Sequence, residues 1–113
     1  MRRSPAASGA VVTGAGGFIG RALVHRLLEA GDEVWAVIRP GTADRLPLHP
    51  RLHPVEGLQA LPEAVDSTPA VCYHLAWRGT AGAAREDALL QAENIRMTLE
   101  TIEWTARLGC KRF

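Results

Sequence analysis

The sequence predicts an α/β fold in which helices cover both faces of a parallel sheet. Short apolar runs alternate along the chain with amphipathic segments of helical period, and this alternation passes through two rounds. A glycine-rich turn at residues 14–20 joins the first apolar run to the first amphipathic segment. A strand, a helix and a second strand in one sheet are nearly always connected in the right-handed sense, so this order implies parallel neighbours.

Length and composition agree with one small domain. The chain has 113 residues, of which 47% are hydrophobic and 22% are charged, and no window approaches the roughly 20 apolar residues that span a bilayer. The formal net charge of +1 favours neither nucleic acid nor an anionic membrane as a partner. The two cysteines lack the spacing of a zinc site or a disulfide framework, so no metal site is predicted. These features favour a cytoplasmic protein.

The first half of the chain is predicted to contain two buried strands and one helix. We expect residues 1–9 to form a disordered leader and residues 10–113 to form the domain. Apolar and β-branched residues predict strands over 10–13 and 33–38. Between them, apolar positions spaced by three and four residues predict a helix over 18–30.

The second half continues the same alternation. Four prolines between residues 40 and 54 indicate a segment that is mainly loop. The elements expected after it are a short strand at 55–56, a short helix at 61–65, a strand at 70–75, a loop at 78–84 and the longest helix at 85–108. Residues 111–113 have the pattern of another strand, so we expect the sheet to be truncated at the start of strand five.

The first strand-to-helix turn carries the motif Thr13-Gly14-Ala15-Gly16-Gly17-Phe18-Ile19-Gly20. A pyrophosphate bound at such a corner contacts backbone N–H groups at the helix N-terminus, and this approach requires positions without a Cβ. Gly14, Gly17 and Gly20 fill these positions with the spacing G-x-x-G-x-x-G. No Gly-Lys-[Ser/Thr] occurs, which excludes a P-loop. The motif predicts a Rossmann-type dinucleotide site, and a glycine-rich turn that binds nothing is the alternative.

Arg39 stands at the end of the second predicted strand, about twenty residues after the glycines, where a dinucleotide fold places the group that meets the adenosine ribose. A guanidinium forms charge-assisted hydrogen bonds with a 2′-phosphate, whereas a carboxylate repels it. Arg39 therefore favours NADP over NAD as the cofactor. The alternative is an ordinary solvated arginine before Pro40.

The fourth predicted strand ends in Cys72-Tyr73-His74-Leu75-Ala76-Trp77. Ligands of open α/β sheets lie at the carboxyl ends of the strands, so the backbone of Leu75, Ala76 and Trp77 is placed to line a cofactor groove. A histidine such as His74 is more often a hydrogen-bonded structural residue than a proton carrier.

Together these residues resemble the extended short-chain dehydrogenase/reductases, and within them the NAD-dependent epimerase/dehydratase family. The resemblance rests on the glycine motif, His74 to Trp77, Asn94 with Thr98 and Leu99, and residues 109–113. It implies NAD or NADP as cofactor and hydride transfer on a nucleotide-sugar by an epimerase, dehydratase or reductase, which would be an isomerase or an oxidoreductase. It also implies a homodimer for the full-length protein.

The resemblance also implies roles for individual residues. Implied cofactor contacts come from Gly14, Gly17, Phe18, Ile19, Gly20, Arg39, Leu75, Ala76 and Trp77. Leu58 stands where family members usually have an acidic residue that meets the adenine, and it takes that place in the implied site. Asn94 would support the site from the long helix. Thr80 and Arg85 would face substrate, with an ordinary exposed loop as the alternative.

The family's proton-transfer pair, Tyr-x-x-x-Lys with a preceding Ser or Thr, has no counterpart in the sequence. The chain contains one tyrosine, Tyr73, and one lysine, Lys111, far from that spacing. We therefore assign no catalytic residue and expect the chain alone to be inactive, as the front fragment of an enzyme or as a short gene product. The alternative is a non-catalytic module that senses a dinucleotide or binds a partner.

Overall fold

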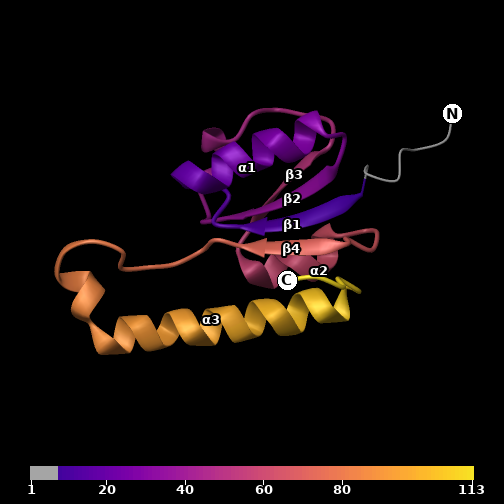
Figure 1. The fold of residues 1–113 in the computed structure, drawn as a ribbon. Helices are drawn as coiled ribbons and strands as arrows, with labels where there is room; N and C mark the ends of the chain where they lie inside the picture. The colour runs from indigo at the N-terminus through magenta and orange to yellow at the C-terminus, as the bar shows by residue number, and fades with distance from the viewer. Residues whose placement is uncertain (1–7) are drawn as a thin grey trace, which may run out of the picture.

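The computed structural model describes residues 8–113, and most of the predicted leader lies outside them. Four strands form one sheet: β1 (Gly9–Thr13), β2 (Glu33–Ile38), β3 (Leu52–Glu56) and β4 (Val71–His74). They lie in the order β3-β2-β1-β4, and every neighbouring pair is parallel (Figure 1). This order confirms the predicted Rossmann-type α/β fold.

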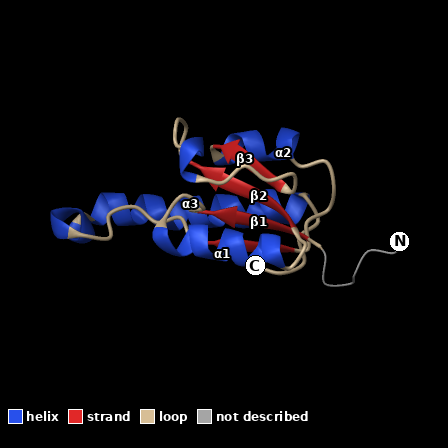
Figure 2. Cartoon of the chain, turned by 90° about the horizontal axis from the view of Figure 1, so that it is seen from above, coloured by secondary structure: helices blue, strands red, loops and turns tan. Residues whose placement is uncertain are grey.

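Helices cover both faces of the sheet. Helix α1 (Phe18–Glu29) lies on one face, and α2 (Leu61–Ala64) and α3 (Ala88–Arg107) lie on the other (Figure 1). The first part of α3 reaches beyond the sheet, as the view from above shows (Figure 2). Three 3-10 turns occur in the connections: η1 (Ala43–Arg45), η2 (Leu58–Ala60) and η3 (Gly82–Glu86). Within residues 8–113, no helix combines the length and the apolar character needed to cross a bilayer.

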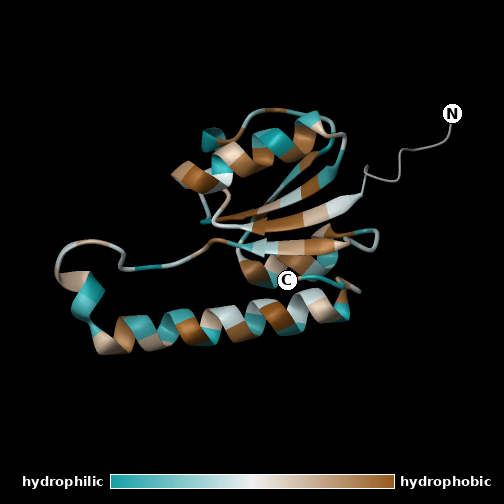
Figure 3. Cartoon of the chain, viewed as in Figure 1, coloured by the Kyte–Doolittle hydropathy of each residue, from teal (hydrophilic) through white to brown (hydrophobic). Residues whose placement is uncertain are grey.

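The sheet separates two apolar cores. Side chains of neighbouring strand residues point to opposite faces, so Val12 packs toward α1 and Val11 toward α2 and α3. Figure 3 shows the apolar residues of β1 and β2 between the helices. Burial on both faces explains why these two strands are nearly continuous in their apolar character.

Several element boundaries differ from those predicted, among them those of β3, β4 and α3. Strand β3 begins at Leu52 rather than at residue 55 and contains Pro54. As an edge strand it pairs only with β2, so a residue without an N–H group is tolerated there. Strand β4 is shorter at both ends than predicted. Helix α3 begins at Ala88 rather than at residue 85, because the Asp87 side chain accepts hydrogen bonds from two first-turn N–H groups and caps the helix.

The buried face of α3 is not the apolar face. Thr101 and Thr105 are almost fully buried, whereas Ile95 and Leu99 are more than half exposed. Each threonine hydroxyl donates to the carbonyl oxygen four residues earlier, at 2.7 Å, so neither leaves a polar group unsatisfied. The apolar side chains of Ile95 and Leu99 are therefore not the ones that α3 buries.

The segment after α3, predicted to begin another strand, forms an isolated bridge with β4. Arg112 forms a parallel bridge with Val71, the Lys111 N–H donates to the Ala70 carbonyl, and the Cys72 N–H donates to the Arg112 carbonyl.

Candidate functional site

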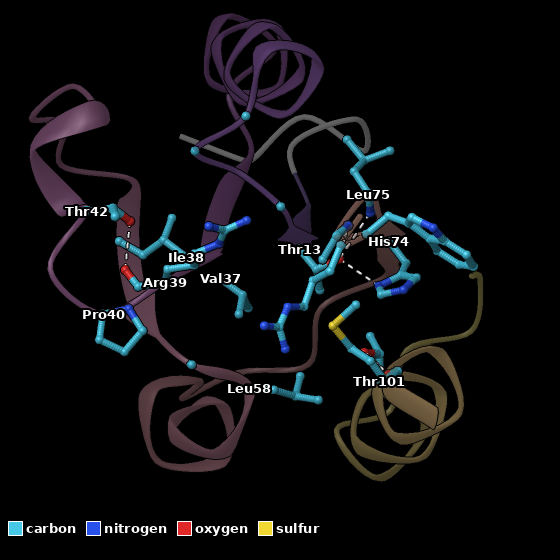
Figure 4. Close-up of a pocket in the computed structure, with 18 of the residues that line it drawn as sticks. Thr13, Val37, Ile38, Arg39, Pro40, Thr42, Leu58, His74, Leu75 and Thr101 are labelled. Carbon is cyan, nitrogen blue, oxygen red and sulfur yellow. Dashed lines mark hydrogen bonds between the residues drawn. The ribbon is translucent and has the colours of Figure 1, made fainter. Parts of the chain in front are cut away.

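A cavity of about 530 Å³ opens at the carboxyl ends of the strands. One side is formed by the end of β2 with Ile38 and Arg39, the other by the end of β4 with His74 and Leu75, and Thr13 of β1 lies between them (Figure 4). The chain leaves β1 toward β2 and β3 and later returns to β4 on its other side, so β1 marks the topological switch point of the sheet. Ligands of open α/β sheets bind at this place, and the volume falls in the usual range for ligand pockets.

The glycine turn lies at the β1–α1 corner and borders this cavity. Gly14 has a φ of +65°, and a Cβ added there would lie 2.8 Å from the Ala76 nitrogen. A Cβ on Gly20 would lie 2.0 Å from the Gly14 carbonyl oxygen, so α1 could not pack against the turn. Gly17 is different, since it has an ordinary φ of −79° and its nearest contact would be 3.4 Å away. Two of the glycines are thus required by packing, whereas a Cβ on the third would make only an ordinary contact.

The N-terminus of α1 has no side-chain cap. Its N-cap residue is Gly17, and no acidic residue occupies its first turn. Helix α3 instead begins with the carboxylate of Asp87 bound to its backbone N–H groups. The first N–H groups of a helix have no intrahelical partner and carry partial positive charge, so the start of α1 suits an anionic ligand.

The charges around the cavity are positive. Arg39, Arg45 and Arg78 line it, and no acidic residue does. Within the described residues none of the three forms an ion pair. Arg39 and Arg45 belong to the β2 side, whereas Arg78 follows β4. Phosphate groups could therefore meet guanidinium groups at both ends of the cavity.

The structure brings most of the predicted cofactor residues together, but not all. Those that line the cavity are Gly14, Gly17, Arg39, Leu58, Leu75, Ala76 and Trp77. The side chains of Phe18 and Ile19 are exposed on the first turn of α1, and Gly20 is buried beneath the glycine turn. Thr80 and Arg85 are exposed and do not line the cavity. Tyr73 and Lys111 also lie outside it, so the cavity contains no tyrosine–lysine pair from this chain.

Several lining residues were not predicted from the sequence. Thr13 and Ile38 immediately precede predicted residues, so the strand ends could have identified them. Arg45 comes from η1, and Met97 and Thr101 come from α3, so only the tertiary packing brings them to the cavity.

Asn94 holds the loop after β4 against α3. Its Oδ1 accepts from the Arg78 N–H at 2.8 Å, and its Nδ2 donates to the Arg78 carbonyl oxygen at 2.7 Å. The residue is fully buried. This double hydrogen bond fixes the backbone that carries Trp77 and Arg78 into the cavity wall, in agreement with the supporting role expected for Asn94.

Replacing Asn94 is expected to loosen this wall. The variant N94A leaves both backbone groups of Arg78 without their partner, and we expect the free energy of unfolding to fall by about 1–3 kcal/mol. Urea unfolding followed by circular dichroism measures this loss. E93A, which removes a neighbouring exposed side chain with only a 3.8 Å ion pair to Arg96, is the matched control and should change stability by less than about 0.5 kcal/mol. Equal losses in the two variants would contradict the role of Asn94.

The β4 side of the cavity contains a small polar network. His74 Nδ1 lies 2.7 Å from Thr13 Oγ1, and His74 Nε2 lies 3.0 Å from Thr98 Oγ1. Burial lowers the pKa of His74 below its ordinary value of 6.5, because the charged imidazolium is poorly solvated there. The imidazole is therefore neutral at neutral pH.

Comparisons with known proteins agree with this architecture. A model of the NAD dependent epimerase/dehydratase family matches residues 10–113. No sequence among the curated proteins matches the chain.

Solved structures share the fold. The enzyme WbmH of Bordetella bronchiseptica, in complex with NAD+, is 23% identical with a TM-score of 0.71 over 94% of this chain and 37% of its own. A short chain dehydrogenase of Burkholderia cenocepacia, in complex with NADP, is 26% identical with a TM-score of 0.73 over 90% of this chain and 48% of its own. The UDP-glucose 4-epimerase of Thermotoga maritima, with UDP-glucose, is 22% identical with a TM-score of 0.70 over 91% and 35%. The chain thus spans less than half the length of each.

Proposed function

The chain belongs to the NAD-dependent epimerase/dehydratase family, and on this premise we propose that it binds a nicotinamide dinucleotide in the cavity at the carboxyl edge of its sheet. The observation that carries the proposal is the glycine corner. It places an uncapped helix N-terminus and the open position at Gly17 at the border of a cavity lined by three arginines and no acid. Family membership and these features point to the same class of ligand.

The residues present fit such a cofactor. The start of α1 would hold the pyrophosphate, because a phosphate can approach its N–H groups where Gly17 has no side chain. The ends of β2 and β3, with Arg39 and Leu58, would hold the adenosine half. The backbone of Leu75 and Ala76 would border the other half.

We further propose that the cofactor is NADP rather than NAD. At the end of β2 the cavity is lined by Arg39, with Arg45 on the same side, and no carboxylate is among its lining residues. The nearby Glu56 carboxylate instead accepts from the Gly41 N–H at 2.8 Å. The Thr42 hydroxyl and N–H both donate to the Arg39 carbonyl, which fixes the turn that carries Arg39.

The proposed parent activity is hydride transfer on a nucleotide-sugar, as epimerisation, dehydration or reduction. When bound, the cofactor supplies a hydride acceptor or donor. The residues of this chain bind and orient it, and none of those lining the cavity supplies the tyrosine and lysine that move the proton in the family. The UDP-glucose in the Thermotoga maritima epimerase supports this substrate class.

Calorimetric titration of the chain with NADP+ and NAD+ tests the cofactor assignment. We expect both to bind, and NADP+ to bind about 10- to 100-fold more tightly, which corresponds to one or two hydrogen bonds to a charged phosphate. Equal or tighter binding of NAD+ would contradict the role of Arg39. Absence of binding by either dinucleotide would refute the cofactor site itself.

A further inference from the structure

The network of Thr13, His74 and Thr98 connects three elements at the wall of the cavity. Thr13 ends β1, His74 ends β4, and Thr98 lies on α3. The Thr13 side chain also contacts the loop that follows β4, because its Oγ1 accepts from the N–H groups of Leu75 at 3.0 Å and Ala76 at 3.2 Å. Figure 4 shows the side chains of Thr13 and His74 together, with the backbone nitrogen of Leu75 directed at Thr13.

The hydroxyl of Thr13 can have only one orientation. A hydroxyl oxygen accepts through two lone pairs and donates one proton. The Leu75 and Ala76 N–H groups occupy both lone pairs of the Thr13 hydroxyl, although the Leu75 N–H also donates to the Thr13 backbone carbonyl at 3.3 Å. The hydroxyl proton therefore points to Nδ1 of His74, 2.7 Å away. Nδ1 is therefore an acceptor and carries no proton.

The hydrogen bond on the other side of the imidazole independently indicates the same tautomer. The Thr98 hydroxyl donates to the carbonyl oxygen of Asn94 in its own helix, at 2.9 Å. Its single proton is thereby used, so Thr98 Oγ1 must accept from Nε2 of His74 at 3.0 Å. The two threonines thus require the same neutral tautomer, with the proton on Nε2.

We infer that His74 is a positioning residue whose neutral Nε2–H form orients the Thr13 hydroxyl and so holds the Leu75 and Ala76 amides in the wall of the cofactor cavity. Protonation places a second N–H on Nδ1, which faces the hydroxyl proton of Thr13. Thr13 must then turn its proton away and release at least one of the two amides. Cofactor binding is consequently coupled to the protonation of His74, and this coupling rests on the proposed function.

Charged and titratable groups lie near His74 on several elements. Cys72 lies on the same face of β4, and burial raises the pKa of its thiol to about 12. From the segment after α3, the Phe113 ring stacks on the imidazole with ring centroids 5.8 Å apart, and it follows Lys111 and Arg112. Arg78 borders the same part of the cavity. From α3 the contact is the Thr98 hydroxyl.

The direction of the pH effect follows from the lowered pKa of His74. The unfolded chain binds this proton at the ordinary value near 6.5, and the folded chain binds it only at lower pH. The network therefore contributes its full stability above pH 6.5 and loses it as the pH falls through the folded-state pKa.

Two measurements test the inference. The tautomer is read from long-range ¹H–¹⁵N correlation spectra of the cofactor-free chain at pH 7.5, where we expect the Nε2–H form. An Nδ1–H form or an imidazolium would overturn the proposed order of hydrogen bonds. This result does not depend on whether a cofactor binds.

The coupling is measured by calorimetric titration with NADP+ between pH 5 and 8. The 2′-phosphate of the cofactor titrates near pH 6, so the readout is the ratio of dissociation constants between the wild type and H74N, which keeps an acceptor toward Thr13 but does not titrate. As the pH falls, we expect the dissociation constant of the wild type, divided by that of H74N, to rise. The limiting slope of this rise is about tenfold per pH unit. H25N, which removes an exposed histidine on α1, should follow the wild type.

If the NADP+ dissociation constants of H74N and the wild type changed in parallel with pH, the coupling would be overturned. If H74N does not fold, Thr13 provides a second pair of variants. T13S keeps the hydroxyl and should show the wild-type dependence of NADP+ affinity on pH. T13V lacks the hydroxyl and should lose this dependence. Identical profiles of T13S and T13V would overturn the inference. Absence of NADP+ binding at every pH would refute the proposed function and the coupling together, while the tautomer spectrum still decides the network.

Discussion

The substitution G20A is expected to destabilise the chain severely, whereas G17A is expected to leave it folded. A Cβ on Gly20 would lie 2.0 Å from the Gly14 carbonyl oxygen and 2.8 Å from the Ala15 Cα. Both are backbone atoms, so α1 must move away from the turn. Forced overpacking of this kind costs at least the upper end of the usual range, about 3 kcal/mol or more. Thermal unfolding followed by circular dichroism should show a melting temperature lowered by more than about 10 °C.

Gly17 provides the matched comparison. A methyl group there would meet the Gly14 oxygen at an ordinary 3.4 Å, and the backbone conformation suits any residue. G17A should therefore melt within about 3 °C of the wild type. It should nevertheless bind NADP+ at least about tenfold more weakly, because the methyl group occupies the approach to the helix N–H groups. Unchanged binding by G17A would show that the phosphate does not dock at this corner.

Replacing Arg39 is expected to change the choice of cofactor. R39A removes the guanidinium at the end of β2, and we expect NADP+ binding to weaken by about 10- to 100-fold, the range for hydrogen bonds to a charged group. NAD+ has no 2′-phosphate, so its affinity should change by less than about threefold. Because Arg39 is exposed, added salt should reduce the preference of the wild type for NADP+. Calorimetric titrations of both dinucleotides at two salt concentrations measure these differences.

R26A is the control for this experiment. Arg26 is an exposed arginine in the last turn of α1, so its loss changes the net charge equally at the other end of the helix from the glycine corner. R26A should bind both dinucleotides like the wild type. If R39A weakened NADP+ and NAD+ binding equally, Arg39 would support the cavity but would not select the 2′-phosphate.

Local patterns of the sequence were sufficient to predict the fold and several residues that line the candidate cavity. The spacing of apolar residues distinguishes the strand β2 from the helix α1 in the sequence. A strand buried on both faces is continuously apolar, whereas a surface helix is apolar on one face. The glycine spacing identifies the β1–α1 corner because the absence of a Cβ is a local requirement. Residues that follow strand ends, such as Arg39 and Leu75, are placed by the rule that parallel strands end at one edge.

Features that depend on tertiary packing were not predictable in the same way. The apolar period places Ile95 and Leu99 on one face of α3, but the buried positions of this helix include Thr101 and Thr105. Their hydroxyls donate hydrogen bonds to backbone carbonyl groups of the same helix, so these small side chains can be buried at little cost in free energy. The position of Arg45 at the cavity depends on η1, a short turn without periodicity.

The central claim is that a phosphate-bearing cofactor docks on backbone amides at the β1–α1 corner. Amide ¹H–¹⁵N spectra of the labelled chain, recorded during titration with NADP+, test it residue by residue. The account predicts that the largest saturable shifts fall on residues 14–20 and on Leu75 and Ala76, with Arg39 affected more by NADP+ than by NAD+. Saturable shifts confined to other parts of the chain, with the amides of Gly14, Gly17 and Gly20 unchanged, would contradict it.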